Sequence, residues 1–298
     1  MDFHGIIPAL TTPFGPDGAP DLAALADNVE RTVAAGVHGL VGTGTMGEGS
    51  SMDREERAAV LATIVAAADG RVPVLAGIAA PTPVVACAYA EDAREAGAAG
   101  LMVLPPLLYE GTYAETAAYF DAVCEASGLP LIAYNNPQAA GYDLSPELLV
   151  QLAADLEQVV CVKECSGDVR RIPAILNGSD GALRVLVGGD DWAFEGLSVG
   201  ADGWISGVAD VLAAECVELH DLIAARRLEP AQELYGKLLP MARFDMTPKL
   251  VQYYKAGMDL VGLVGGPVRP PRMALGAAEQ EALVAALALV RDPAQETG

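Results

Sequence analysis

The sequence predicts an α/β fold, a (β/α)₈ TIM barrel followed by a C-terminal helical extension. Eight short apolar segments alternate with longer helix-like segments between residues 5 and 206. Each segment is nearly continuously apolar, as expected of parallel strands that are covered on both faces. They recur about every 26 residues, the scale of one βα unit in such a barrel. Because no break in composition interrupts the pattern, a closed barrel (residues 1–210) is favoured over an open, doubly wound sheet, and residues 211–298 are expected to pack on it as the extension.

The first units illustrate how each element is identified. Residues 5–10 form an apolar run that predicts the first strand, and residues 12–15 form the loop after it. A helical pattern at 21–35 leads to a second strand at 39–41. The next helix, predicted at 53–68, begins with acidic residues and is rich in alanine, which suits both the helix dipole and intrinsic helix propensity.

The later units continue this alternation without a linker or a low-complexity segment. Further strands are predicted at residues 72–78, 100–104, 129–134, 159–163, 183–187 and 203–206. Helices between them are predicted at residues 84–96, 115–125 and 146–156. After residue 206 only helices are predicted, at 212–226, 230–239, 248–261 and 278–290, and these form the extension.

The composition describes a chain with a large buried core and argues against two classes of partner. Hydrophobic residues make up 52% of the chain and charged residues 19%, the opposite of the balance in disordered proteins. The formal net charge of −22 argues against a nucleic-acid partner, because phosphate binding needs clustered Lys and Arg. No apolar run reaches the roughly 18 residues of a membrane span. We therefore expect neither a nucleic-acid nor a membrane partner.

The N-terminus and the cysteines predict a cytoplasmic protein. Residues 1–4 lack the basic region and apolar stretch of a signal peptide. Five cysteines, with no close C-x-x-C pair, suit a reducing compartment better than a disulfide framework. Cys161 and Cys165 lie four residues apart, but no histidine is near them in the sequence, so both are predicted to be small core residues instead of zinc ligands.

Lys163 is the most informative residue at the carboxyl ends of the predicted strands, where active sites of such barrels lie. The chain has four lysines, and the other three fall in the predicted extension: Lys237, Lys249 and Lys255. An ammonium at the end of a buried strand is costly unless it is paired or deprotonated, and a neutral lysine amine can attack a carbonyl. The alternative is a lysine that extends to solvent or pairs with Glu164. Neighbouring strand residues point to opposite faces, so Glu164 is expected to face away.

Two further strand ends are candidates for the same site. Tyr134 ends the preceding strand and should lie beside Lys163, where its phenol would transfer protons to and from the substrate. An aromatic side chain that only caps the barrel is the alternative. The loop at residues 44–47 offers backbone N–H groups and the Thr45 hydroxyl, which suit a carboxylate. Its alternative is a tight turn that needs glycine for steric reasons.

Two competing motifs lack the structural context that they require. Residues 42–47 satisfy the G-x-G-x-x-G dinucleotide pattern, but Asp69 precedes the next strand instead of following it, so the acid that binds the ribose is absent. Residues 196–200 satisfy G-x-S-x-G, the serine-hydrolase signature. However, Ser198 lies late in a helical segment instead of at a sharp turn after a strand, so we interpret this match as chance.

The sequence predicts neither a metal nor another cofactor. The three histidines, His4, His38 and His220, are scattered along the chain and do not follow strands as metal ligands would. Asp190 and Asp191 are expected to N-cap the helix that begins near Trp192 instead of binding a cation.

With these residues, the chain resembles the dihydrodipicolinate synthase / N-acetylneuraminate lyase family along nearly its whole length. The matching segments are residues 5–14, 44–48, 134–137, 163–168 and 188–191, in the same order and at similar spacing. The resemblance implies a class I lyase in which Lys163 forms a Schiff base with pyruvate or another 2-keto acid. It implies that Tyr134 is the proton-transfer phenol and that Thr45 is the hydroxyl partner of that phenol.

The resemblance also predicts the residues that bind the substrate and the state of assembly. The backbone N–H groups of Thr45 and Met46 are expected to hold the carboxylate of the keto acid, and Ile205 to line the pocket. The expected substrate-binding residues are Gly44, Met46, Gly47, Ile205, Gly189 and Ala139. A homotetramer or homodimer is expected.

Three departures from the family pattern argue against lysine biosynthesis. Met46 stands where many members have a second threonine, and Ala139 where the synthases have an arginine that binds a dicarboxylate. Leu108 stands where members commonly have a tyrosine that reaches a neighbouring subunit's site, although Tyr109 follows it. We therefore expect aldol cleavage or condensation of a 2-keto acid whose distal part is not a carboxylate held by arginine.

Three other functions remain open at the level of sequence. A dehydratase of a 3-deoxy-2-keto sugar acid would use the same lysine chemistry. A sensor that binds a keto acid without turnover would retain the pocket alone. A nicotinamide-dependent oxidoreductase would need the ribose-binding acid that the chain lacks.

Overall fold

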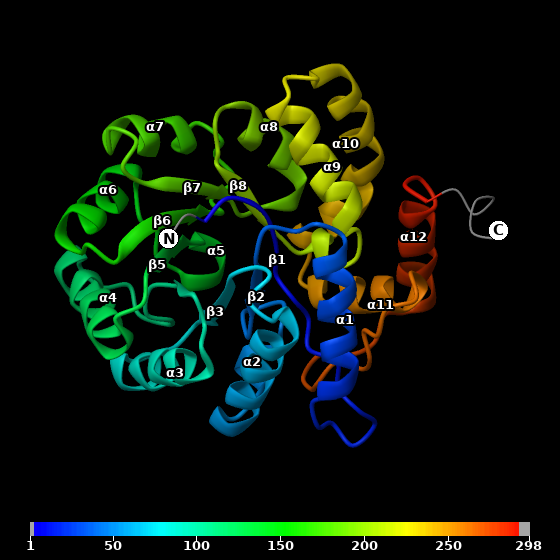
Figure 1. Cartoon of the computed structure of the whole chain (residues 1–298), viewed down its shortest axis with the longest axis horizontal. Coiled ribbons are helices and arrows are strands. Elements are labelled where there is room, and N and C mark those ends of the chain that lie inside the picture. Colours follow the sequence, from blue (N-terminus) through cyan, green and yellow to red (C-terminus); the bar gives the residue numbers. More distant parts are fainter. Residues whose placement is uncertain (1–2, 292–298) are drawn as a thin grey trace.

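The computed structural model describes residues 3–291, and a sheet of parallel strands closed into a barrel forms its centre (Figure 1). The strands are β1 (Gly5–Pro8), β2 (Leu40–Gly42), β3 (Val74–Ile78), β4 (Gly100–Val103), β5 (Leu131–Asn135), β6 (Val159–Glu164), β7 (Arg184–Val187) and β8 (Gly203–Ser206). Their order is β1-β8-β7-β6-β5-β4-β3-β2. A parallel bridge between Ala9 and Val41 joins β1 to β2. The predicted TIM barrel is confirmed, while predictions for residues 1, 2 and 292–298 lie outside the described residues.

Helices follow the strands and surround the barrel (Figure 1). They are α1 (Leu22–Ala34), α2 (Arg54–Ala68), α3 (Pro83–Ala96), α4 (Tyr113–Ser127), α5 (Pro137–Ala140), α6 (Pro146–Asp155), α7 (Arg171–Gly178), α8 (Ala193–Ser198) and α9 (Ala213–Ala224). The 3-10 segments are η1 (Gly49–Ser51), η2 (Asp190–Trp192) and η3 (Val208–Asp210). The sequence pattern does not mark α5 or α7, because helices this short give little periodicity, whereas α8 coincides with the helix expected to begin near Trp192. Among the helices of residues 3–291, none has the length and apolar character needed to cross a bilayer.

Side-chain caps fix where two of the barrel helices begin. The Asp53 carboxylate accepts from the Glu56 N–H at 2.8 Å, and the Glu56 carboxylate accepts from the Asp53 N–H at 3.2 Å. Thr112 and Glu115 form the same reciprocal box at the start of α4. Such boxes satisfy N–H groups that the helix itself leaves unpaired, so each βα loop enters its helix at a defined residue.

The chain after β8 first completes the helical layer and then forms the extension. Helix α9 packs against β1 and α8. We therefore propose that the barrel includes α9 and that the extension starts after Ala224, and not at residue 211 as the sequence suggested. The extension consists of α10 (Leu228–Ala242), η4 (Arg243–Met246), α11 (Leu250–Leu260) and α12 (Ala277–Leu287). Figure 1 shows these elements on one side of the barrel.

A buried ion pair joins this extension to the loop after β2. Lys255 of α11 is 1% exposed and Glu48 is fully buried, and Lys255 Nζ lies 2.9 Å from Glu48 Oε1. The same ammonium donates to the carbonyl oxygens of Thr12 at 2.8 Å and Pro267 at 2.6 Å. The other carboxylate oxygen accepts from the Arg269 N–H at 3.0 Å. Buried charges persist only when hydrogen-bonded in this way, so the pair specifies how the extension docks on the barrel.

The three histidines, expected to be scattered, lie together beside β1, and that expectation is wrong in three dimensions. The His38 ring centroid lies 5.5 Å from that of His4 and 5.3 Å from that of His220. His38 Nδ1 accepts from the Ile6 N–H at 3.1 Å. Gly5, at φ +70°, leaves the space: a Cβ built there would lie 2.3 Å from the His38 ring. Burial and the nearby His220 and His4 rings lower the pKa of His38, while Asp221 raises it.

We expect this cluster to make the protein less stable in mild acid. Since the pKa of His38 is lower in the folded protein than its ordinary 6.5, the unfolded chain binds more protons as the pH falls. The stability that neutral His38 contributes is fully present above pH 6.5. It is lost as the pH falls from 6.5 through the lowered pKa of His38 in the folded protein. Urea unfolding between pH 7.5 and 5.5 measures the loss, and the slope should be smaller in His38→Gln. Equal slopes in the two proteins would contradict the assignment.

Candidate active site

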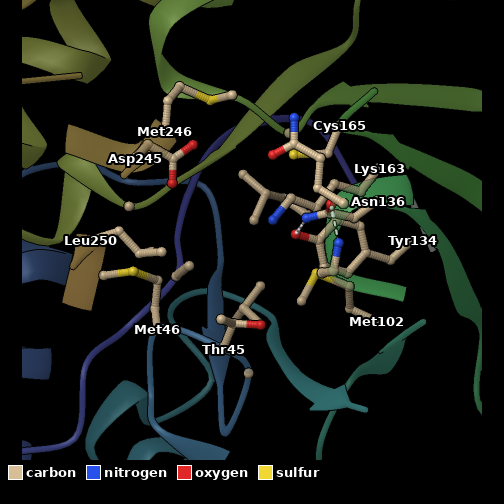
Figure 2. A pocket seen from close by; sticks show the side chains of 18 of the residues that line it. Thr45, Met46, Met102, Tyr134, Asn136, Lys163, Cys165, Asp245, Met246 and Leu250 are labelled. Atoms are coloured by element: carbon tan, nitrogen blue, oxygen red, sulfur yellow. Dashed lines mark hydrogen bonds between the residues drawn. The ribbon is translucent and has the colours of Figure 1, made fainter. Parts of the chain in front are cut away.

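A cavity of about 310 Å³ opens at the carboxyl ends of the strands, and Figure 2 shows the side chains that line it. Its lining comes from the ends of β1, β2, β4, β5, β6 and β8, from loops, and from the extension. The lining residues are Ala9, Leu10, Val41, Gly44, Thr45, Met46, Met102, Tyr134, Asn136, Gln138, Ala139, Lys163, Cys165, Gly188, Ile205, Gly207, Asp245, Met246, Thr247, Pro248 and Leu250. The position is where barrels of this type carry their chemistry.

Lys163 and Tyr134 lie side by side in the wall of this cavity. They are direct partners in the β5–β6 register, and Lys163 Nζ lies 4.2 Å from the centroid of the Tyr134 ring. The two residues are 6% and 7% exposed. Glu164 faces the other side of the strand, as expected, where it accepts from the Ser166 N–H at 2.6 Å and from Asn135 Nδ2 at 3.1 Å. The Lys163 amine is thus directed to the cavity and not to the neighbouring carboxylate.

The Tyr134 hydroxyl is held by a residue of its own loop. Asn136 Nδ2 donates to it at 2.9 Å, while Asn136 Oδ1 accepts from the Ala139 N–H at 3.0 Å and caps α5. Burial raises the pKa of Tyr134 well above its ordinary value of 10, so the phenol carries its proton at neutral pH. Its hydroxyl can therefore donate to a substrate atom while Asn136 fixes its position. The Thr45 hydroxyl, which the resemblance pairs with this phenol, is exposed at the cavity (Figure 2).

The glycine-containing loop after β2 contributes three of its four residues to the lining. Gly44, Thr45 and Met46 face the cavity, and Gly47 is excluded from the lining. A Cβ at Gly47 would lie 3.1 Å from Leu10 O and 3.2 Å from Thr43 N, so the close packing of backbone atoms favours glycine there. The loop then enters the three-residue segment η1 and not a long helix, which removes the context of a dinucleotide fingerprint.

Of the other predicted substrate-binding residues, two line the cavity and one does not. Ile205 of β8 and Ala139 of α5 are in the lining. Gly188 is also there, but Gly189 lies under the Trp192 ring, where a Cβ would be 2.1 Å from Trp192 Nε1. Ser198 is the last residue of α8, late in a helix as predicted, and not at the sharp turn after a strand that the serine-hydrolase signature requires.

The prediction that Asp190 and Asp191 cap a helix is wrong. The residue before η2 is Gly189, and no side chain caps this segment. Asp190 is fully buried and accepts from Trp204 Nε1 at 2.9 Å, the Val208 N–H at 2.8 Å and the Tyr254 hydroxyl at 2.7 Å. Its three donors come from β8, η3 and α11, so this one carboxylate holds the three elements together.

Cys165 also differs from its prediction. Cys161 is buried in the core as expected, but Cys165 lines the cavity next to Lys163 (Figure 2). Burial raises the pKa of the Cys165 thiol to about 12, and the neighbouring Lys163 opposes that shift. The thiol therefore stays protonated at neutral pH. Strand alternation places residue 165 on the same face as Lys163, so the spacing of these two residues carries a signal for this position.

The extension supplies one wall of the cavity, including the acidic residue Asp245, which the sequence pattern does not reveal. Asp245 Oδ2 accepts from the Asp190 N–H at 3.3 Å. Burial and the Asp190 charge raise the pKa of Asp245 to about 8, and Lys163 opposes them. No local pattern marks this residue, since only the return of the chain after α10 brings it to the barrel. Within residues 3–291 no group of three or more His, Cys, Asp and Glu side chains is arranged to hold a metal ion.

Comparisons with known proteins agree along nearly the whole chain. A family model described as the dihydrodipicolinate synthetase family matches residues 2–289. The 4-hydroxy-tetrahydrodipicolinate synthase of Hyphomonas neptunium is 35% identical over 289 residues, 96% of this chain and 98% of that protein. The synthase of the same name from Methanopyrus kandleri is 34% identical over 272 residues, 91% of each chain. The crystal structure of YagE, a prophage protein of this family from E. coli K12 in complex with pyruvate, has a TM-score of 0.92 and 29% identity, covering 97% of this chain and 99% of its own.

Proposed function

The chain belongs to the dihydrodipicolinate synthetase family, a family of Schiff-base lyases, and from that premise we propose that it catalyses aldol cleavage or condensation of pyruvate or a related 2-keto acid through Lys163. The observation that carries the proposal is the pair of Lys163 and Tyr134, adjacent in register and directed into one cavity. A solved relative named as a pyruvate complex supports the choice of keto acid.

The chemistry follows from an amine and a protonated phenol side by side. The Lys163 amine adds to the ketone carbon, and the ketone oxygen leaves as water to give an iminium. Loss of a proton from C3 gives an enamine, whose C3 attacks an aldehyde carbon, and the aldehyde oxygen takes up a proton to become a hydroxyl. Water then hydrolyses the iminium and frees the amine. Tyr134 would donate and accept the protons, and cleavage is the same sequence reversed.

The loop after β2 is proposed to orient the keto acid. Thr45 and Met46 face the cavity opposite Lys163, where their backbone N–H groups would hold the carboxylate and the Thr45 hydroxyl would complete the proton path from Tyr134. Fixing the carboxylate aligns the ketone carbon with the amine, which removes part of the entropic barrier to their reaction.

Two features favour a reaction other than the synthase step of lysine biosynthesis. Ala139 lines the cavity at the position where the synthases carry arginine, so a dicarboxylate would lack its partner there. Among the described residues, Lys163 is the one cationic side chain in the lining, and the Schiff base consumes it. We therefore propose that the second reactant is not a carboxylate-bearing aldehyde.

The proposal includes a homodimer or homotetramer in the cytoplasm. Leu108, with φ 65° and 96% of its surface exposed, and Tyr109, 55% exposed, project from the β4–α4 loop. Apolar side chains so exposed favour burial against another chain. The Tyr109 hydroxyl donates to Glu115 Oε1 at 3.0 Å, which keeps it near its own α4. No disulfide joins the cysteines of the described residues, which is compatible with a reducing compartment.

Trapping of the Schiff base tests the central step. Pyruvate followed by borohydride should leave a reduced pyruvyl adduct that mass spectrometry maps to Lys163. Lys163→Ala should give none, and Lys237→Ala, which removes an exposed lysine of α10, should give the wild-type amount. Failure of the wild-type protein to form an adduct with pyruvate and with larger 2-keto acids would exclude the mechanism. It would favour a function on this fold that does not involve Lys163.

A further inference from the structure

The acidic and basic side chains around the cavity are few and lie on opposite sides. Asp245 is the one carboxyl group in the lining, and Lys163 is the one cation, among residues 3–291. The remaining polar side chains of the lining are uncharged at neutral pH: Thr45, Tyr134, Asn136, Gln138, Cys165 and Thr247. Figure 2 shows Asp245 across the cavity from Tyr134 and Lys163, next to Met246. A keto acid bound to Lys163 would therefore have Asp245 facing the half of the substrate that does not carry the ketone.

The Asp245 carboxyl has hydrogen-bonding capacity left for a ligand. Its one hydrogen bond within the described residues is the long one, 3.3 Å, from the Asp190 N–H to Oδ2. The Asp190 carboxylate behind it is already occupied by Trp204, Val208 and Tyr254, so it does not compete for the same ligand. An ionised carboxylate accepts hydrogen bonds at both oxygens, and a protonated one donates as well as accepts. Asp245 thus offers a hydroxyl group a partner in either form.

We propose that Asp245 binds a hydroxyl of the second reactant and so selects an uncharged hydroxyaldehyde, an inference that rests on the proposed Schiff-base function of Lys163. A hydroxyl donates to or accepts from the Asp245 carboxyl, and the amide of Gln138 lies in the same lining for a second one. An aldehyde with a distal carboxylate finds no free cation in the described lining to pair with, because the Schiff base uses Lys163. An alkyl aldehyde would leave Asp245 desolvated without a new partner, which is costly in a site built for hydrogen bonding.

The test measures condensation of pyruvate with three aldehydes. Glyceraldehyde carries hydroxyls, propanal has the same carbon count without them, and succinic semialdehyde carries a distal carboxylate. Each is assayed with the wild-type protein, Asp245→Ala, Asp245→Asn and Arg243→Ala. The last removes an exposed side chain from the same segment η4, outside the cavity lining. Borohydride trapping of pyruvate on every variant reports separately whether the Lys163 site is intact.

The wild-type protein should have its highest kcat/KM with glyceraldehyde. Asp245→Ala should lower that value about 10- to 100-fold while changing the value for propanal less than about threefold. Asp245→Asn, whose amide both donates and accepts, should retain activity with glyceraldehyde within about tenfold, and Arg243→Ala should match the wild type. All four proteins should trap pyruvate.

The results separate failure of the proposed Schiff-base function from failure of the Asp245 assignment. If the wild-type protein traps no pyruvate, the proposed function fails and this selectivity fails with it. If pyruvate is trapped, the assignment of Asp245 is overturned by a preference for succinic semialdehyde, by turnover of none of the three aldehydes, or by an equal loss with glyceraldehyde and propanal in Asp245→Ala. An equal loss would mean that Asp245 only supports η4 and does not contact the substrate.

Discussion

Tyr134→Phe is expected to slow pyruvate enamine formation by about 10²- to 10⁴-fold, the range of a single positioned acid–base group. The substitution keeps the ring beside Lys163 and removes the hydroxyl that Asn136 holds at 2.9 Å. Without that hydroxyl, proton transfers during loss of water and loss of the C3 proton must use bulk water. Exchange of the pyruvate methyl protons for deuterium, followed by NMR, measures the rate without a second reactant.

Tyr119→Phe provides the matched control for this experiment. Tyr119 is a buried tyrosine of α4, 2% exposed, whose hydroxyl has no hydrogen-bond partner among the described residues. Removing that hydroxyl should leave the exchange rate unchanged. Exchange in Tyr134→Phe within about threefold of the wild type would show that another group moves the protons and that Tyr134 only caps the barrel.

Lys255→Met is expected to have the largest effect on stability, a loss of about 3–5 kcal/mol in the free energy of unfolding. The variant keeps the length of the apolar stem and removes the ammonium, so the Glu48 carboxylate stays buried with one of its charged partners removed. It also leaves the carbonyl oxygens of Thr12 and Pro267 without their donor. Urea unfolding at pH 7 measures the loss, with Lys237→Met as the exposed control on α10.

The double variant Lys255→Met, Glu48→Gln separates the charge from the packing. Neutralising Glu48 removes a buried carboxylate that has lost its closest cation, so the double variant should be more stable than Lys255→Met alone. A loss below about 1 kcal/mol in Lys255→Met would show that water enters and solvates the pair. In that case Lys255 would not be what positions the extension against the loop at Glu48.

The sequence was most informative where chemistry and strand geometry coincide. Lys163 could be identified because a single lysine ends an apolar strand, and Tyr134 because parallel strands place their last residues side by side. The loop at Thr45 and Met46 followed from the same rule. These predictions need only local pattern and the neighbour relations of a parallel barrel, and the register of β5 and β6 agrees with them.

Residues whose role depends on contacts distant in sequence could not be predicted in this way. Asp190 was interpreted as a helix cap because an acid before a helix usually is one. Its real partners, Trp204, Val208 and Tyr254, lie 14, 18 and 64 residues further along the chain. A buried carboxylate takes whatever donors the packed structure brings to it, and no local pattern encodes which these are.

The sequence by itself therefore determined the barrel, its strands and the Lys163–Tyr134 pair, because hydrophobic periodicity and strand alternation are local properties. Only the tertiary structure decided which side chains complete the cavity. The extension packs against the carboxyl end of the barrel, where the Lys255–Glu48 ion pair joins the two. This packing places Asp245 across the cavity from Lys163. The tertiary structure also brought His4, His38 and His220 together at β1. Such placements follow from how helices pack and where the chain turns back, which depends on the whole fold and not on any one segment.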